Sequence, residues 1–173
     1  SRHFRNQLWL LAQGDEWGAF TEFAAPWITG FRLNQPAMRV SRDGQELDVF
    51  IDEVGSRVPK EVIWAGDGMQ VWLQILYHAY RLRDSPTIVL DEPDVYLHAD
   101  LQRRVVRLFD SLDCQTVIAT HSPEVISEMP TRGVIWIDKA KRHAKTLVDD
   151  SLLEELSNTL GSQFNLKLAS AMK

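Results

Sequence analysis

The chain has 173 residues, of which 45% are hydrophobic and 25% are charged, which is typical of a globular protein. Its formal net charge of −5 excludes a global basic field for nucleic acid, and no apolar run approaches the roughly 20 residues of a membrane helix. The only cysteine, Cys114, excludes an internal disulfide framework, so we expect a protein of a reducing compartment, the cytoplasm.

The first third of the chain predicts helices followed by a β-hairpin. Residues 3–13 carry leucines at helical spacing, and Gly14 is expected to end this helix. Aromatic residues recur every three or four positions over 15–35, which favours packing in a core over a surface that stacks bases. Two alternating runs then flank Asp43-Gly44, a strong signal for a hairpin turn.

The rest of the chain predicts strands that alternate with helices, as in an α/β protein with a parallel sheet. Two continuous apolar runs are expected to be strands that are buried on both faces. The expected order is a helix from Asp67, a strand at 87–90, a helix at 99–112, a strand at 115–120, a short helix opened by 121–123, a third strand at 133–138, the segment 145–148 pairing with that strand or continuing the sheet, and a helix at 151–161.

Chemically active side chains follow the two apolar strands. Asp91 comes directly after the first strand, where α/β proteins bind ligands, and one carboxylate there suits Mg²⁺ held through water. The adjacent Glu92 can act as a general base on water. His121 follows the second strand and can donate to a phosphate oxygen or orient water. The alternatives are a plain strand-end turn for the acids and a structural role for the histidine.

These residues carry a resemblance to ABC-type ATPases. TIVLDEP resembles the Walker B strand, which implies Asp91 as the magnesium-side acid and Glu92 as the catalytic base, and ATHSPEVI resembles the switch-histidine segment around His121. VYLHADLQRR resembles the D-loop of the OLD-family and RecF/SMC-like branch, in which Leu97-His98 stands where transporters have Leu-Asp. The resemblance implies that Leu97 and His98 contact a partner subunit; alternatively, His98 is a surface residue at a helix start.

IWAGDGMQVWLQIL resembles the ABC signature segment at a helix N-terminus. Gly66 and Gly68 permit close backbone approach, and the helix dipole favours a phosphate near Gln70. The family usually has a serine where Asp67 or Ala65 stands here, and Asp67 places a negative charge where the γ-phosphate is expected. The alternative is an ordinary helix capped by a Gly-Asp-Gly turn.

A phosphate-loop motif, G-x-x-x-x-G-K-[ST], is missing from the printed sequence. The resemblance therefore implies the C-terminal half of an ABC-type P-loop NTPase sheet with flanking helices, preceded by a helical and β-hairpin segment. We expect no ATP turnover from the chain alone. The expected domain organisation is a helical and hairpin segment at 1–60, a core with signature, Walker B, D-loop and switch at 61–150, and a helix and linker toward a following domain at 151–173.

The resemblance implies an ATPase that uses ATP and Mg²⁺ and works as a head-to-tail homodimer. It also implies an effector in DNA processing, DNA repair or phage defence, and the OLD-family resemblance implies that this effector is a Toprim endonuclease domain. One alternative is a structural or regulatory assembly module without turnover. A further alternative is a nucleotide-independent hydrolase with a metal on Asp91, Glu92 and His121.

DNA contact is a separate expectation. A dense basic turn between two expected strands offers Lys139, Lys141 and Arg142 to a phosphate backbone. A second group of arginines lies on the helix after the acids, and for it a solvated helix face is favoured over DNA contact. That group consists of Arg103, Arg104 and Arg107.

Overall fold

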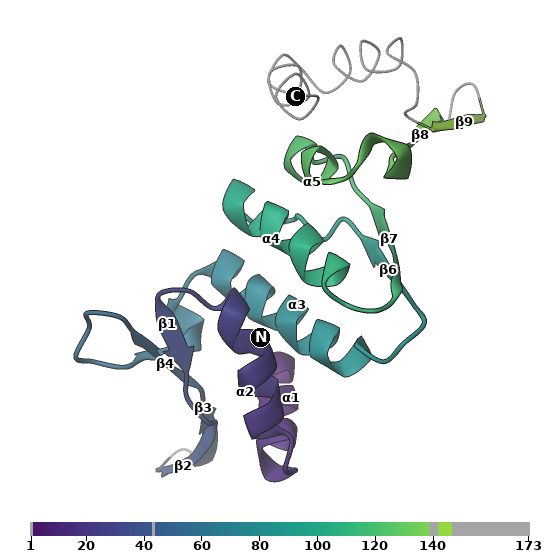
Figure 1. Cartoon of the computed structure of the whole chain (residues 1–173). Helices are drawn as coiled ribbons and strands as arrows, with labels where there is room; N and C mark the ends of the chain where they lie inside the picture. Colours follow the sequence, from purple (N-terminus) through teal and green to yellow (C-terminus); the bar gives the residue numbers. More distant parts are fainter. Residues whose placement is uncertain (1, 43, 139–141, 147–173) are drawn as a thin grey trace. The chain divides into compact units, whose positions relative to one another are not determined.

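The computed structural model describes residues 2–42, 44–138 and 142–146 (Figure 1). The chain divides into two compact units, one of Ser1–Pro86 with Leu112–Cys114 and the other of Thr87–Ser111 with Gln115–Lys173. The helix expected at 151–161 lies outside the described residues. None of the helices in the described ranges combines the length and apolar character needed to cross a membrane.

Three α-helices form the helical part of the first unit: α1 (Arg2–Gln13), α2 (Trp17–Ala24) and α3 (Asp67–Leu82). Phe4, Leu8 and Leu11 lie on one face of α1 and are buried, which confirms the helix expected at 3–13. Two 3₁₀ turns, η1 (Ala25–Trp27) and η2 (Val62–Trp64), follow α2 and precede α3.

Five short strands complete the first unit. The predicted hairpin is confirmed, with β2 (Ala37–Ser41) antiparallel to β3 (Gly44–Asp48) and Ser41 opposite Gly44 across the turn. The sequence did not predict the three-stranded sheet of β1 (Phe31–Leu33), β4 (Phe50–Glu53) and β5 (Lys60–Glu61). These strands are only two to four residues long, too short for an alternating pattern to stand out.

The core of the first unit lies between α2 and α3. Phe20 is fully buried and its ring centroid lies 5.5 Å from that of Tyr80, which confirms core packing for this residue of the aromatic stripe. The other aromatic residues of the stripe are half-buried. On α3, the buried face is centred on Trp72 and Leu76, and the Trp72 indole N–H donates to the Trp27 carbonyl oxygen at 3.2 Å.

The second unit contains a parallel strand pair and two helices (Figure 1). β6 (Thr87–Asp91) pairs in parallel with β7 (Gln115–Ala119), which confirms the predicted pairing direction. Between them, α4 (Ala99–Asp110) buries the apolar face that its spacing predicts, and α5 (Pro123–Glu128) packs against α4. A 3₁₀ turn, η3 (Thr131–Gly133), follows α5.

One expectation about these strands is wrong, and a second is confirmed only in part. β6 and β7 are not buried on both faces, since Val89 and Val117 lie opposite each other and are 70% and 48% exposed. Successive side chains point to opposite faces of a strand, and among the described residues only the face that carries Ile88 is covered. The third strand, β8 (Ile135–Asp138), pairs antiparallel with β9 (His143–Thr146), which confirms the expected pairing of the third strand with the segment that begins at Lys145. These two strands form a separate sheet and do not extend the sheet of β6 and β7.

Candidate functional site

The predicted acids and histidine meet where β6 and β7 end. Asp91 is the last residue of β6 and lies opposite Ala119, the last residue of β7. The Glu92 N–H donates to the Ala119 carbonyl oxygen at 2.8 Å and so extends the strand pairing by one bond. Because the strands are parallel and in this register, Glu92 and His121 leave the sheet at the same edge.

Glu92 has a strained backbone. Its φ angle is +47°, in the left-handed region, which a residue with a Cβ adopts at an energy of about 1–3 kcal/mol. Pro93 follows and cannot continue the strand. This turn brings the Glu92 Oε2 atom to 2.7 Å from His121 Nδ1. Two residues that are far apart in sequence thus form one acid–imidazole pair.

The electrostatics of the pair favour a charged imidazole. Hydrogen bonding to Glu92 and then the negative charge of Glu92 raise the pKa of His121 above 6.5. Desolvation opposes this shift, and the charge of Asp94 makes the smallest contribution, which also raises the pKa. The Glu92 Oε2 atom is shielded from solvent, and the 2.7 Å ion pair with His121 Nδ1 is its only polar contact among the described residues. The imidazole, whose side chain is 77% exposed, is therefore the group placed to neutralise it.

Asp91 lies beside this pair but does not join it. Its side chain is exposed at the end of β6. Carboxylate oxygens are the donors that Mg²⁺ prefers, and an exposed carboxylate leaves room for the waters that Mg²⁺ retains. The donor set at this edge of the sheet therefore fits the magnesium ion that the sequence predicts, with Asp91 as the accessible ligand.

Asp94 is a central residue that sequence analysis missed. It is buried, at 8% exposure, and its Oδ1 atom accepts a hydrogen bond from Thr120 Oγ1 at 2.5 Å. The Ser122 N–H donates to the same threonine hydroxyl at 2.9 Å. Asp94 was visible in the sequence as the last member of the DEPD run, but nothing in the sequence showed that Thr120 would reach it.

Glu92, Asp94 and His121 also form a group that could hold a metal ion. Each offers one ligand atom, and these atoms lie within 4.8 Å of one another. Asp91, which the metal-hydrolase alternative used, is not a member of this group. The protein already provides partners at this site, because Glu92 faces His121 and Asp94 accepts from Thr120.

The D-loop-like residues have clear structural positions. Leu97 is buried, and its N–H donates to the Asp94 carbonyl oxygen at 3.0 Å. His98 is the N-cap of α4, and its Nδ1 atom accepts a hydrogen bond from the Leu101 N–H at 3.3 Å. The structure thus supports the alternative interpretation of His98 as a surface residue at a helix start, since His98 is both the N-cap and exposed.

The signature-like residues lie in the first unit. Gly66 caps α3 with φ +81° and ψ 156°, a conformation that suits glycine alone, and a Cβ there would point into open space. Asp67 is the exposed first residue of α3, and Gly68 lies in its first turn. The Gln70 amide donates to the Ile63 carbonyl oxygen at 3.3 Å. The helix N-terminus that the sequence predicts is therefore present.

The two groups of basic residues, on α4 and between β8 and β9, have different surroundings. The arginines of α4 pair with carboxylates, Arg103 with Glu124 at 2.6 Å and Arg107 with Glu128 at 3.0 Å. Arg104 pairs with Asp100 one turn away on the same helix. The solvated placement that the sequence favours holds for Arg107, which is exposed, whereas Arg103 and Arg104 are half-buried. Arg142, between β8 and β9, is exposed. Lys139 and Lys141 lie outside the described residues.

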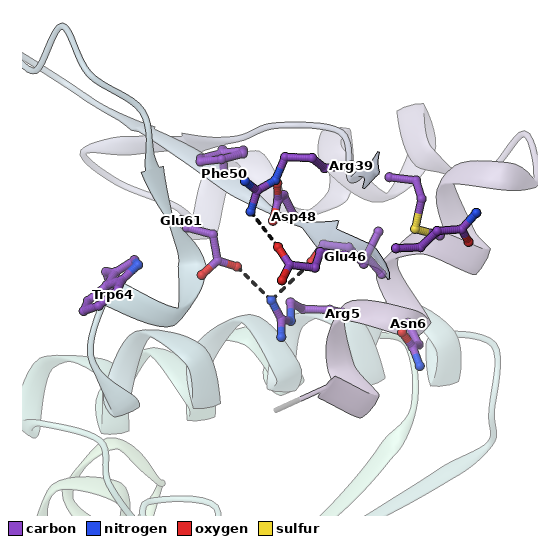
Figure 2. Close-up of a pocket in the computed structure, with 11 residues that line it drawn as sticks. Arg5, Asn6, Arg39, Glu46, Asp48, Phe50, Glu61 and Trp64 are labelled. Atoms are coloured by element: carbon purple, nitrogen blue, oxygen red, sulfur yellow. Dashed lines mark hydrogen bonds and ion pairs between the residues drawn. The ribbon is translucent and has the colours of Figure 1, made fainter. Parts of the chain in front are cut away.

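A separate cavity of about 940 Å³ lies in the first unit (Figure 2). Arg5 reaches Glu61 at 3.2 Å, and Arg39 reaches Glu46 at 2.7 Å and Asp48 at 2.8 Å. The charges on its walls are thus paired with one another, as the dashed lines of Figure 2 show for Arg5 and Arg39. No residue of the predicted site lines this cavity.

Known proteins share sequence or fold with this chain. Protein ea59 of Escherichia phage lambda is 29% identical over 138 residues, which is 75% of this chain. The chain spans about a quarter of the length of this curated relative, 24%.

Two solved structures of SMC proteins share the fold. One, from work on ATP-driven dimerization and DNA-stimulated activation of SMC ATPases, has a TM-score of 0.60 and 15% identity and covers 90% of this chain and 96% of that chain. The other is an Smc head domain from Pyrococcus furiosus bound to the C-terminal domain of ScpA, with a TM-score of 0.52 and 14% identity. It covers 81% of this chain and 36% of that one.

A family model described as "AAA domain, putative AbiEii toxin, Type IV TA system" matches residues 12–127. The matched range contains the Glu92–His121 pair, Asp91 and the helix N-terminus at Gly66. Because the match covers more than half of the chain, this chain belongs to that AAA domain family, and its fold is similar to that of SMC ATPase heads.

Proposed function

We propose that this chain is part of an OLD-like ABC ATPase that hydrolyses ATP with Mg²⁺ as a head-to-tail dimer. The observation that carries the proposal is the 2.7 Å pair of Glu92 Oε2 and His121 Nδ1 beyond neighbouring parallel strands. Membership in an AAA domain family and the fold of SMC heads support the same reaction class. The OLD-like assignment rests on the Leu97-His98 form of the D-loop segment.

In this proposal, each residue at the strand ends has one task. Glu92 accepts a proton from the attacking water, and the strained turn aims its carboxylate. Because Glu92 engages Nδ1 of His121, Nε2 is the ring nitrogen that remains to donate to a phosphate oxygen. Asp91 would hold Mg²⁺, which in phosphoryl transfer neutralises charge on the phosphates.

The dimer and its effector belong to the same proposal. In a head-to-tail dimer, Gly66, Gly68 and Gln70 at the start of α3 would face the nucleotide of the partner, and Leu97 and His98 would contact the partner subunit. The SMC structure of similar fold comes from work on ATP-driven dimerization, which supports this arrangement. Closure would gate a DNA-processing or phage-defence effector, for which a Toprim nuclease is our candidate.

The test is Glu92→Gln in the natural protein that contains this chain. We expect ATP turnover to fall about 10²- to 10⁴-fold, because the general base is removed, while ATP-dependent association persists. Turnover is measured by phosphate release and association by analytical ultracentrifugation. Glu22→Gln, an exposed glutamate of α2, is the matched control and should leave turnover unchanged. Unchanged turnover in Glu92→Gln would reject the assigned base.

A second candidate is an assembly module that retains the ATPase fold without turnover. It is favoured by Asp67, whose exposed carboxylate stands at the start of α3 where the ABC resemblance expects a phosphate. A negative charge at that position opposes an anionic ligand. This candidate predicts that ATP leaves the oligomeric state unchanged and that Asp91→Ala has no effect on assembly. An ATP-dependent shift in sedimentation would remove it.

DNA contact through the segment between β8 and β9 remains a separate proposal. Arg142 is exposed there, and Lys139 and Lys141 precede it in the sequence. Reversing two charges, with Lys141→Glu and Arg142→Glu, should weaken DNA binding and reduce its salt dependence. Unchanged affinity over a salt titration would exclude this segment as a contact.

A further inference from the structure

The side chain of Gln102 joins two segments of the second unit. Gln102 lies in the first turn of α4, and its Nε2 atom donates to the carbonyl oxygens of Leu97 at 2.7 Å and Asp94 at 3.4 Å. Its Oε1 atom accepts a hydrogen bond from the Ser122 hydroxyl at 2.7 Å. Carbonyl oxygens can only accept, so this orientation of the amide is the one that satisfies all three partners.

Both chain neighbours of His121 are held by this network. Thr120 donates to the buried Asp94 carboxylate, and Ser122 donates to Gln102. The Ser122 N–H also donates to the Thr120 hydroxyl, which closes a tight turn around His121. The backbone of His121 is thus fixed on either side by side-chain bonds to the 94–97 segment and to α4.

His121 itself has little packing to hold it. Its side chain is 77% exposed, and the ion pair with Glu92 is the contact on which the proposed reaction depends. An exposed imidazole keeps such a geometry only if its backbone is placed by other groups, since its own contacts do not restrict it. The bonds from Thr120 and Ser122 provide that placement.

We propose that Gln102 is a positioning residue for the ATPase reaction, which ties the 94–97 segment to Ser122 and so holds His121 against Glu92. The proposal rests on the proposed function for its catalytic consequence. Leu97 and His98 are the residues that we expect to contact a partner subunit. A displacement of that segment would therefore pass through the Gln102 amide to Ser122 and reach His121. Partner contact and the acid–imidazole pair would be coupled by one side chain.

The first test measures the pair without ATP. Gln102→Met retains the length of the side chain and removes all three hydrogen bonds. In the 173-residue chain, the ¹⁵N chemical shifts of the His121 ring should move toward those of Glu92→Gln, the reference in which the carboxylate partner is absent. Gln35→Met is the matched control, because Gln35 is exposed and makes a single long bond of 3.5 Å to the Ala12 carbonyl oxygen. Wild-type His121 shifts in a folded Gln102→Met chain would overturn the proposal.

The second test measures the reaction in the natural protein that contains this chain. Gln102→Met should lower kcat about 10- to 100-fold and leave the KM for ATP within about twofold, because the geometry of reacting groups changes and nucleotide contacts do not. Gln102→Glu retains the acceptor for Ser122 and loses the donor to Leu97, so its kcat should lie between those of the wild type and Gln102→Met. If Gln102→Met lowered kcat/KM by the same factor but did so only by raising KM, with kcat unchanged, that result would contradict a positioning role.

The two tests separate the two ideas. If the natural protein hydrolyses no ATP, the proposed function fails, while the His121 shifts still decide whether Gln102 places the imidazole. If ATP turnover is normal in a folded Gln102→Met protein, the inference fails and the proposed function stands. Where Gln102→Met does not fold, as judged by circular dichroism, Gln102→Glu supplies the same comparisons with a side chain of the same length that retains the acceptor for Ser122 and lacks the donor to Leu97.

Discussion

Ser122 makes two kinds of contact at once, and its replacement by alanine should be among the more destabilising changes in the second unit. Its hydroxyl oxygen caps α5 by accepting from the N–H groups of Glu124 at 3.2 Å and Val125 at 3.3 Å. The same hydroxyl donates to Gln102 Oε1 at 2.7 Å. Ser122 is 5% exposed, so water has little access to replace these bonds.

The expected magnitude follows from these contacts. Loss of an N-cap serine costs about 1 kcal/mol. Loss of a buried hydrogen bond costs about 0.5–1.5 kcal/mol, and more where an acceptor is left without a partner, as Gln102 Oε1 would be. Together we expect Ser122→Ala to lower the free energy of unfolding by about 2–3 kcal/mol, or about 30- to 150-fold in the unfolding equilibrium.

Urea unfolding of the 173-residue chain, followed by far-UV circular dichroism, measures this loss. Ser111→Ala is the matched control, because Ser111 is exposed and its hydroxyl donates only locally, to the Leu108 carbonyl oxygen at 2.6 Å, so its effect should stay within about 0.5 kcal/mol. A double-mutant cycle of Ser122→Ala with Gln102→Met should give a coupling of about 1 kcal/mol. A loss below about 0.5 kcal/mol in Ser122→Ala would refute this account of the contacts.

Three further predictions follow from other features. Glu92→Gln should lower the pKa of His121 toward 6.5, as measured by NMR titration of the imidazole. Because Glu92 raises the pKa of His121 in the folded state, the pair stabilises the fold fully below pH 6.5, and this stabilisation is lost as pH rises through the folded-state pKa. The difference in unfolding free energy between the wild type and Glu92→Gln should therefore shrink over this rise, and a constant difference would contradict the pairing. Gly66→Ala should destabilise the chain by about 1–3 kcal/mol in thermal unfolding, because φ +81° strains a residue with a Cβ, and an unchanged Tm would contradict that conformation. Leu108→Ala, in the core, should cost about 2–5 kcal/mol in urea unfolding, and Val89→Ala about 0.5 kcal/mol or less, whereas equal losses would show that the Val89 face is covered.

Local structure was predictable wherever one short stretch contains the full signal. The hairpin signalled by Asp43-Gly44, the start of α3 after Gly66 and the strand that ends in Asp91 each depend on neighbouring residues. The structure confirms these elements, although Gly44 begins β3 opposite Ser41 and is not a turn residue. The exposed face of β6 was not predictable. A continuous apolar run indicates a strand, but whether Val89 is covered depends on which elements pack against it.

The residue types at the strand ends could be interpreted from the sequence alone. Acids after one apolar run and a histidine after the next predict an acid–imidazole site, because parallel neighbouring strands end at the same edge of a sheet. The way in which these groups are held could be seen only in the folded chain. It showed the 2.7 Å pair of Glu92 and His121, the burial of Asp94 and the three bonds of Gln102. These contacts join residues 5 to 29 positions apart. Periodicity does not encode them, since hydrogen bonds depend on distances and angles that exist only after the chain has folded.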